Sequence, residues 1–125
     1  MPETNPFDPQ DMNAAIEALG ANLKSGWQLG LQLEVPEVGS LRQVVICGMG
    51  GSAIGGDFTT AYLADQLPIP VFVHRNYSLP AWARGPETLV ICSSHSGNTE
   101  ETLSSFNEGL QRGCTLMSIC TGGKL

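Results

Sequence analysis

The sequence has few charged residues, and basic residues are especially scarce. Only 14% of its 125 residues are charged, compared with about 25% in ordinary soluble domains. With 6 Lys and Arg against 12 Asp and Glu, the net charge is −6, which argues against a nucleic-acid-binding surface. No apolar run approaches the roughly 18 residues of a membrane span. The acidic start of the chain has no basic segment, so no secretory signal is predicted.

The cysteines do not form a metal-binding or redox motif. Cys47, Cys92, Cys114 and Cys120 make no Cys-x-x-Cys pair, and neither histidine stands at metal-ligand spacing. Cys47 and Cys92 lie inside apolar runs. We therefore predict buried free thiols in a protein of the reducing cytoplasm, and no metal site.

Residues 1–40 are predicted to form a helix and a connecting loop that pack on the rest of the chain. Asp8 is suited to cap this helix, and Pro9 is suited to its first position. Apolar residues recur at spacings of three and four, so one stripe is expected to face a core. The stripe consists of Met12, Ile16, Leu19, Leu23 and Trp27.

Residues 41–125 alternate strands with helices, which is typical of an α/β fold with a parallel sheet and right-handed crossovers. The strands are predicted at 44–47, 69–73, 88–92 and 115–119. Pro70 indicates that the second strand starts late or lies at an edge. The residues expected to face inward from the two helices are Ile54, Phe58, Ala61, Tyr62 and Leu67 in the first and Leu103, Phe106 and Leu110 in the second. Because a fourth strand and a Gly-Gly turn end the chain, we expect a front piece of a longer protein, truncated after that strand.

Glycines and hydroxyl side chains gather in two turns that lead from a strand into a helix. The first turn is Gly48–Ser52, where glycines allow close backbone approach to a ligand. The second turn is Ser93–Thr99, which is rich in hydroxyl donors. Since helix N-termini at the carboxyl edge of a parallel sheet attract anions, the two turns together predict a phosphate site with neutral donors. Each turn alone also fits a structural role, as a glycine packing cluster or as a helix cap.

Two nucleotide-binding motifs match the first turn less well. Residues 51–57 have the glycine spacing of a P-loop but lack its lysine, which excludes that motif. Gly48, Gly50 and Ala53 fit a dinucleotide fingerprint, although the acidic residue expected after the second strand is missing. Arg75 stands there and is suited to a 2′-phosphate, so an NADP-binding domain stays open as an alternative.

The two turns resemble the signature turns of the sugar isomerase (SIS) domain. The matching segments are GMGGSAIGGD at 48–57, which resembles the bifunctional phosphoglucose/phosphomannose isomerases in particular, and SHSGNTEET at 94–102. The resemblance implies a three-layer, flavodoxin-like α/β sandwich with a five-stranded parallel sheet, of which 41–125 would be an incomplete SIS domain. It also implies a second SIS domain downstream, absent from this chain, and a homodimer of the full-length protein.

The resemblance further implies interconversion of glucose 6-phosphate and mannose 6-phosphate with fructose 6-phosphate, without metal or nucleotide cofactor. In such enzymes hydroxyl groups of these turns hold the phosphate, and the backbone of their glycines lies near the sugar. The matching residues here are Ser52, Ser94, Ser96 and Thr99 for the phosphate, and Gly50, Gly51 and Gly97 for the backbone. His95 stands where the family often has Tyr.

No catalytic residue can be carried over to this chain, because the family's catalytic groups come from sequence beyond position 125. We therefore expect the chain alone to bind sugar phosphate weakly and not to isomerise it. Two alternatives to an isomerase fragment remain open. One is a non-catalytic SIS module that senses a sugar phosphate, and the other is the NADP-binding domain described above.

Overall fold

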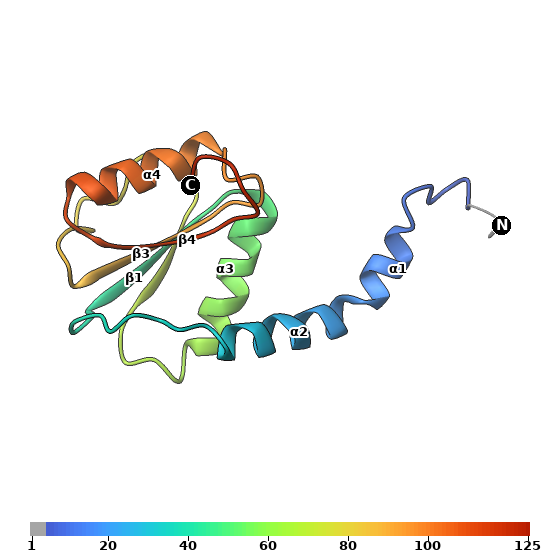
Figure 1. The fold of residues 1–125 in the computed structure, drawn as a ribbon, viewed down its shortest axis with the longest axis horizontal. Helices are drawn as coiled ribbons and strands as arrows, with labels where there is room; N and C mark the ends of the chain where they lie inside the picture. Colours follow the sequence, from blue (N-terminus) through green and yellow to red (C-terminus); the bar gives the residue numbers. More distant parts are fainter. Residues whose placement is uncertain (1–4) are drawn as a thin grey trace. The chain divides into compact units, whose positions relative to one another are not determined.

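The computed structural model describes residues 5–125 (Figure 1). The backbone separates into two compact units, Met1–Glu37 and Val38–Leu125. The described part of the first unit is helical, and the second unit is a layered α/β domain. Within residues 5–125, no helix combines the length and the apolar character needed to cross a membrane.

The described part of the first unit, residues 5–37, contains two helices rather than the single predicted one. They are α1 (Met12–Glu17) and α2 (Leu19–Leu31), and α1 begins three residues after Pro9. The Asp8 carboxylate accepts the N–H groups of Met12 at 2.7 Å and Asn13 at 2.9 Å, so its side chain caps the first turn. The prediction that Pro9 occupies the first helical position is wrong, because Asp11 stands at the N-cap position. The five side chains of the apolar stripe lie on α1 and α2, and their packing against a core stays a prediction.

We expect α1 to lose stability in acid as Asp8 takes up a proton. The N–H groups of Asn13 and then Met12 lower the pKa of Asp8 below its ordinary value of 3.8. The stabilisation is therefore fully present above that ordinary value and is lost as the pH falls through the lowered pKa. Amide exchange at Met12 and Asn13, followed from neutral pH to about pH 2, measures this loss. Asp8→Asn cannot titrate, so a transition that persists in this variant would contradict the assignment.

The second unit is built on one parallel sheet of four strands. In spatial order β2-β1-β3-β4, the strands are β2 (Val71–His74), β1 (Gln43–Cys47), β3 (Thr88–Ser93) and β4 (Thr115–Ile119). The four predicted strands and the α/β class are confirmed. As Pro70 predicted, β2 begins just after this proline and lies at the edge. The order matches the flavodoxin-like arrangement and differs from the 3-2-1-4-5-6 order usual in dinucleotide-binding sheets.

Two helices cover the sheet, one on each face (Figure 1). Helix α3 (Gly50–Leu63) contacts β1 and β2, and α4 (Glu100–Gln111) contacts β3 and β4. This placement follows from right-handed crossovers that lead away from the centre of the sheet in opposite directions. The result is the three-layer arrangement that the resemblance to the SIS domain implies.

The main core lies on one face of the sheet. It contains Val45, Cys47, Leu79, Ala83, Val90 and Cys92. Phe106 and Leu116 pack against this cluster. The prediction of buried free thiols is thus confirmed for Cys47 and Cys92, but it is wrong for Cys120, which is exposed.

The inward face of each helix differs from the prediction. In α3, the buried residues are Ala53 and Gly56, whereas all five predicted inward residues are exposed, including Phe58 at 75%. A Cβ on Gly56 would lie 3.1 Å from Cγ2 of Ile46, so only a small residue lets the helix approach the sheet this closely. In α4 the buried residues are Thr102, Ser105 and Gly109. Of the predicted set, Leu103 and Phe106 are half-buried and Leu110 is 58% exposed.

The loop between β2 and β3 is hydrogen-bonded to an ion pair at the C-terminal end of α4. The Glu108 carboxylate accepts the Leu79 N–H at 2.6 Å and pairs with Arg112 at 2.6 Å. Arg112 also donates to the carbonyl oxygens of Pro80 and Ala83. These bonds hold Leu79 and Ala83 in the core.

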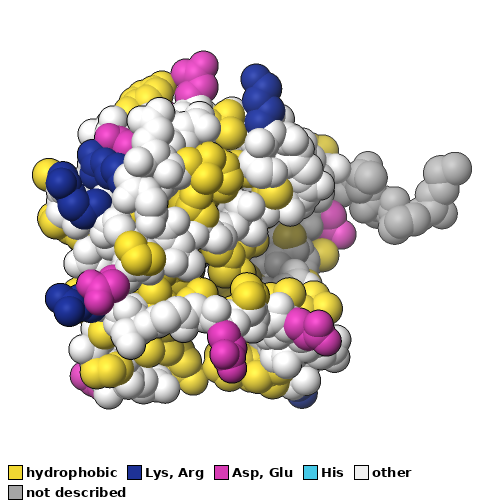
Figure 2. Space-filling view, turned by 60° about the vertical axis from the view of Figure 1, so that its left-hand side comes forward, with side chains coloured by type: hydrophobic (Ala, Val, Ile, Leu, Met, Phe, Trp, Pro, Cys, Tyr) yellow, Lys and Arg dark blue, Asp and Glu magenta, His cyan; other side chains and the backbone are white. Residues whose placement is uncertain are grey.

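On the face drawn in Figure 2, Lys and Arg occupy small areas and hydrophobic side chains cover more, in keeping with the scarcity of basic residues in the sequence.

Candidate functional site

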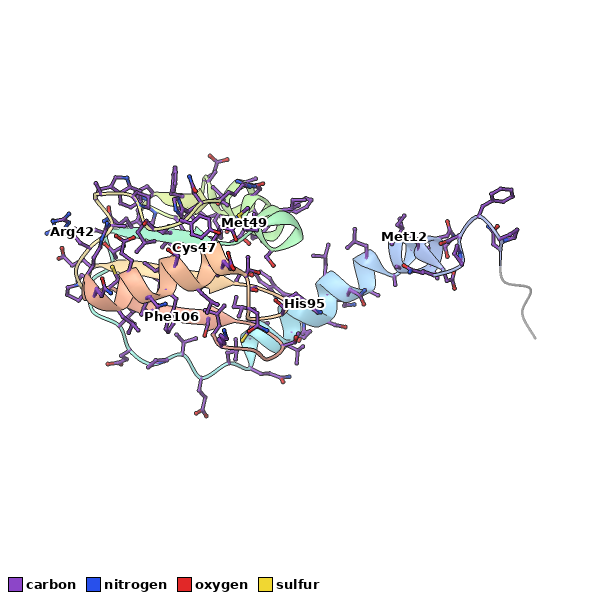
Figure 3. All side chains as sticks on the ribbon, turned by 90° about the horizontal axis from the view of Figure 1, so that it is seen from above. Met12, Arg42, Cys47, Met49, His95 and Phe106 are labelled. Carbon is purple, nitrogen blue, oxygen red and sulfur yellow. The ribbon has the colours of Figure 1, made fainter. Side chains whose placement is uncertain are left out.

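The two predicted turns meet at the carboxyl ends of β1 and β3. Cys47 and Cys92, which precede the turns, are paired in the sheet register. Figure 3 shows Met49 and His95 at the same end of the domain, away from Arg42 at the amino end of β1. The chain leaves β1 and β3 in opposite directions along the sheet, so this is the switch point where open α/β sheets bind ligands.

A hollow of about 530 Å³ lies between the two turns. Its lining consists of Met49, Gly51, Ser52, His95, Ser96 and Thr99. Hydroxyl groups therefore reach it from both turns. The lining contains no lysine, arginine or carboxylate side chain from the described part of the chain, so any anion bound there meets neutral donors.

The first turn brings the N-terminus of α3 to the hollow. A Cβ on Gly48 would lie 3.0 Å from the carbonyl oxygen of Ser93, so glycine allows the two turns to pack closely. Gly50 has a φ of 51° and begins α3. No side chain caps this helix, which leaves first-turn N–H groups such as that of Gly51 for a ligand.

The second turn is organised around one buried hydroxyl. Ser94 is only 2% exposed. Its Oγ accepts the Gly97 N–H at 3.1 Å and shares a hydrogen bond of 2.8 Å with Oγ1 of Thr99. The exposed Ser96 Oγ accepts the Asn98 N–H at 3.2 Å. Ser94 therefore lies beneath the turn, while Ser96 and Thr99 reach the hollow.

The electrostatics of the second turn favour an anion. Helix α4 begins after Thr99 without a side-chain cap, so its N-terminus carries the partial positive charge of unpaired N–H groups. The Glu100 carboxylate in its first turn accepts the Tyr77 hydroxyl at 3.0 Å. This bond and the nearby charge of Glu101 raise the pKa of Tyr77. The bond engages Glu100 with Tyr77, which does not line the hollow.

Comparison with known proteins places this geometry in a family context. No protein-family model matches the chain. The bifunctional phosphoglucose/phosphomannose isomerase of Caldicellulosiruptor bescii is 41% identical over 115 residues, which is 91% of this chain and 34% of that protein. The enzyme of the same name from Aquifex aeolicus is 46% identical over 83 residues, which is 66% of this chain and 26% of that protein. The chain is a homologue of these isomerases. It spans about a third of the length of the first of them.

A solved structure supports the fold of this isomerase homologue. Tagatose-6-phosphate ketose/aldose isomerase from Escherichia coli superposes with a TM-score of 0.52 at 23% identity. The alignment covers 86% of this chain and 29% of the other. The resemblance to SIS-domain isomerases and the α/β class inferred from the sequence are thus confirmed.

The predicted site residues of the isomerase homologue fall into two groups. Gly51, Ser52, Ser96 and Thr99 line the hollow, whereas Ser94 and Gly97 are buried and Gly50 opens α3. Met49 and His95 also line it. Sequence reasoning gave Met49 no role, although its place between two glycines of the motif was a usable signal.

Two further observations bear on the rival functions of the isomerase homologue. Arg75, the candidate for a 2′-phosphate, forms an ion pair with Asp57 of α3. Together with the strand order, this pairing favours the sugar-phosphate interpretation over the NADP interpretation. Across the described residues, no group of three His, Cys, Asp or Glu side chains is placed to hold a metal ion.

Proposed function

We propose that the hollow binds the phosphate group of a hexose 6-phosphate. The observation that carries this proposal is the convergence of two uncapped helix N-termini with hydroxyls of Ser52, Ser96 and Thr99 on one hollow. N–H groups and hydroxyls at such a position suit phosphate oxygens. Homology to enzymes named for phosphoglucose and phosphomannose supports the choice of a sugar phosphate.

The chain would then be the phosphosugar-binding part of an aldose–ketose isomerase. Its substrates would be glucose 6-phosphate and mannose 6-phosphate, interconverted with fructose 6-phosphate. The full-length protein would carry a second SIS domain and would form a homodimer. Residues 1–40 would pack on the incomplete SIS domain of residues 41–125. The free thiols of Cys47 and Cys92 fit a cytoplasmic location.

Residues 41–125 supply binding rather than the chemical step. Aldose–ketose isomerisation moves a proton between C1 and C2, which needs a positioned base and a positioned acid. Of the described residues that line the hollow, only His95 carries an acid–base side chain. This scarcity of acid–base side chains around the hollow also favours a second candidate function, that of a non-catalytic module that senses a sugar phosphate.

We expect fructose 6-phosphate to shift the amide resonances of both turns when it is titrated into the ¹⁵N-labelled chain. The largest shifts should lie at 50–52 and 94–99, because the residues that line the hollow belong to these two segments. Glucose, which lacks the phosphate, should cause none, and the chain should not convert fructose 6-phosphate. Shifts with NADPH alone would refute the proposal in favour of the dinucleotide interpretation.

A further inference from the structure

The last residues of the chain are hydrogen-bonded to the second turn. We call residues 121–125 the C-terminal turn. The amide and the hydroxyl of Thr121 both donate to the carbonyl oxygen of His95, at 3.1 and 2.6 Å. The N–H groups of Lys124 and Leu125 both donate to the carbonyl oxygen of Gly97, at 3.0 and 3.2 Å. Two carbonyl oxygens of the second turn are therefore each bound twice by one segment.

The two segments also pack backbone against backbone. A Cβ on Gly97 would overlap the carbonyl oxygen of Gly122 and lie 3.2 Å from the Cα of Gly123. A Cβ on Gly123 would lie 2.9 Å from the Cα of Gly97. Both glycines have positive φ, at 67° and 86°. The fit thus requires glycine on both sides and leaves little freedom for the second turn to move alone.

These contacts determine which way the peptide groups of the second turn point. In a trans peptide the C=O and N–H groups point in opposite directions. With the carbonyl of His95 bound to the C-terminal turn, the N–H group of Ser96 points away from that turn. The N–H group of Asn98, opposite the Gly97 carbonyl, donates to Oγ of Ser96. An N–H group that faces an anion attracts it, whereas a carbonyl oxygen repels it.

We infer that Thr121 is a positioning residue for anion binding. It does not line the hollow, and it acts by holding the His95 carbonyl away from the bound phosphate. The C-terminal turn as a whole fixes the peptide dipoles of the second turn in the orientation that binds phosphate. This inference rests on the proposed phosphate site.

The test compares Thr121→Val with a matched threonine on the same strand–turn segment. Thr115 also donates its hydroxyl to a backbone carbonyl, that of Pro86 at 2.8 Å, but at the other end of β4. Titration of inorganic phosphate and fructose 6-phosphate should show binding weakened about threefold to tenfold by Thr121→Val, the effect of one hydrogen bond. Thr115→Val should bind as the wild type does. Thr121→Ser keeps the hydroxyl and should restore the affinity.

The outcomes separate the two proposals. If the wild-type chain binds neither probe, the proposed phosphate site is wrong and the inference is refuted with it. If the wild type binds and Thr121→Val binds equally well, the positioning role alone is refuted. Equal losses in Thr121→Val and Thr115→Val would assign the effect to general destabilisation and would also refute the role.

A measurement on the unmodified chain avoids any folding defect of the variants. Because coupling between two sites is reciprocal, a C-terminal turn that favours phosphate binding must itself be stabilised by phosphate. Saturating phosphate should therefore slow amide hydrogen exchange at Thr121, Lys124 and Leu125 by about the same threefold to tenfold. Unchanged exchange at these amides, with phosphate bound, would overturn the inference.

Discussion

Gly97→Ala is expected to disrupt the second turn and to abolish binding of fructose 6-phosphate. Gly97 has a φ of 67°, where a Cβ costs about 1 to 2 kcal/mol. The new Cβ would also overlap the carbonyl oxygen of Gly122 and lie 2.9 Å from its carbonyl carbon, so backbone must move. Strain and overpacking together should lower the free energy of unfolding by about 3 kcal/mol or more. Urea denaturation and a fructose 6-phosphate titration measure the two effects.

Gly113→Ala is the matched control for this substitution. Gly113 has nearly the same φ, 68°, but a Cβ there would meet nothing within 4 Å. Gly113→Ala should therefore lower the free energy of unfolding by only about 1 to 2 kcal/mol, the cost of a Cβ at this backbone conformation. Binding of fructose 6-phosphate should stay intact. Equal losses of stability in the two variants would show that the contact with the C-terminal turn is unimportant.

The strands of the sheet were predictable because a parallel strand is buried on both faces. The run Val44–Cys47 is apolar throughout, and all four residues are buried. The start of β2 was equally readable, since Pro70 cannot donate to a neighbouring strand. In both cases the residue types within a few positions of each other are enough to locate the strand.

The buried faces of the helices were not predictable in the same way. Helical periodicity selected Ile54 and Phe58, but the structure leaves both exposed and brings Ala53 and Gly56 to the sheet. Close packing of α3 depends on the space between its backbone and Ile46, which a Cβ on Gly56 would fill. Such steric limits depend on residues far apart in sequence, so a hydrophobic pattern cannot reveal them.

In the candidate site, too, local sequence features were predictable, whereas contacts between residues distant in sequence were not. The sequence identified both turns, because glycines and hydroxyls at strand ends have a direct chemical meaning. It treated Ser94 and Ser96 alike, and only the structure shows one buried beneath the turn and the other exposed. Thr121 was missed because its partner, His95, lies 26 positions away.

That difference between the two serines gives the second large expected effect, which concerns binding. Ser96→Ala should weaken fructose 6-phosphate binding by about tenfold to a hundredfold, because a hydrogen bond to a charged group contributes about 1.5 to 3 kcal/mol. Stability should change by no more than about 0.5 kcal/mol, since the Ser96 side chain is exposed. Titration calorimetry and urea denaturation of the same preparation measure both quantities.

Ser94→Ala should lower stability and binding together, and this contrast makes the prediction specific. The variant loses the bond between Oγ of Ser94 and the Thr99 hydroxyl, and the Gly97 N–H keeps only the Ser94 carbonyl as acceptor. The loss of a hydrogen bond made by the buried Ser94 side chain costs about 0.5 to 1.5 kcal/mol. If Ser96→Ala instead destabilises the chain as much as Ser94→Ala, Ser96 supports the turn rather than contacting phosphate. If Ser96→Ala changes neither quantity, the phosphate is not bound by the exposed hydroxyl of the second turn, and the hollow between the turns is not its site.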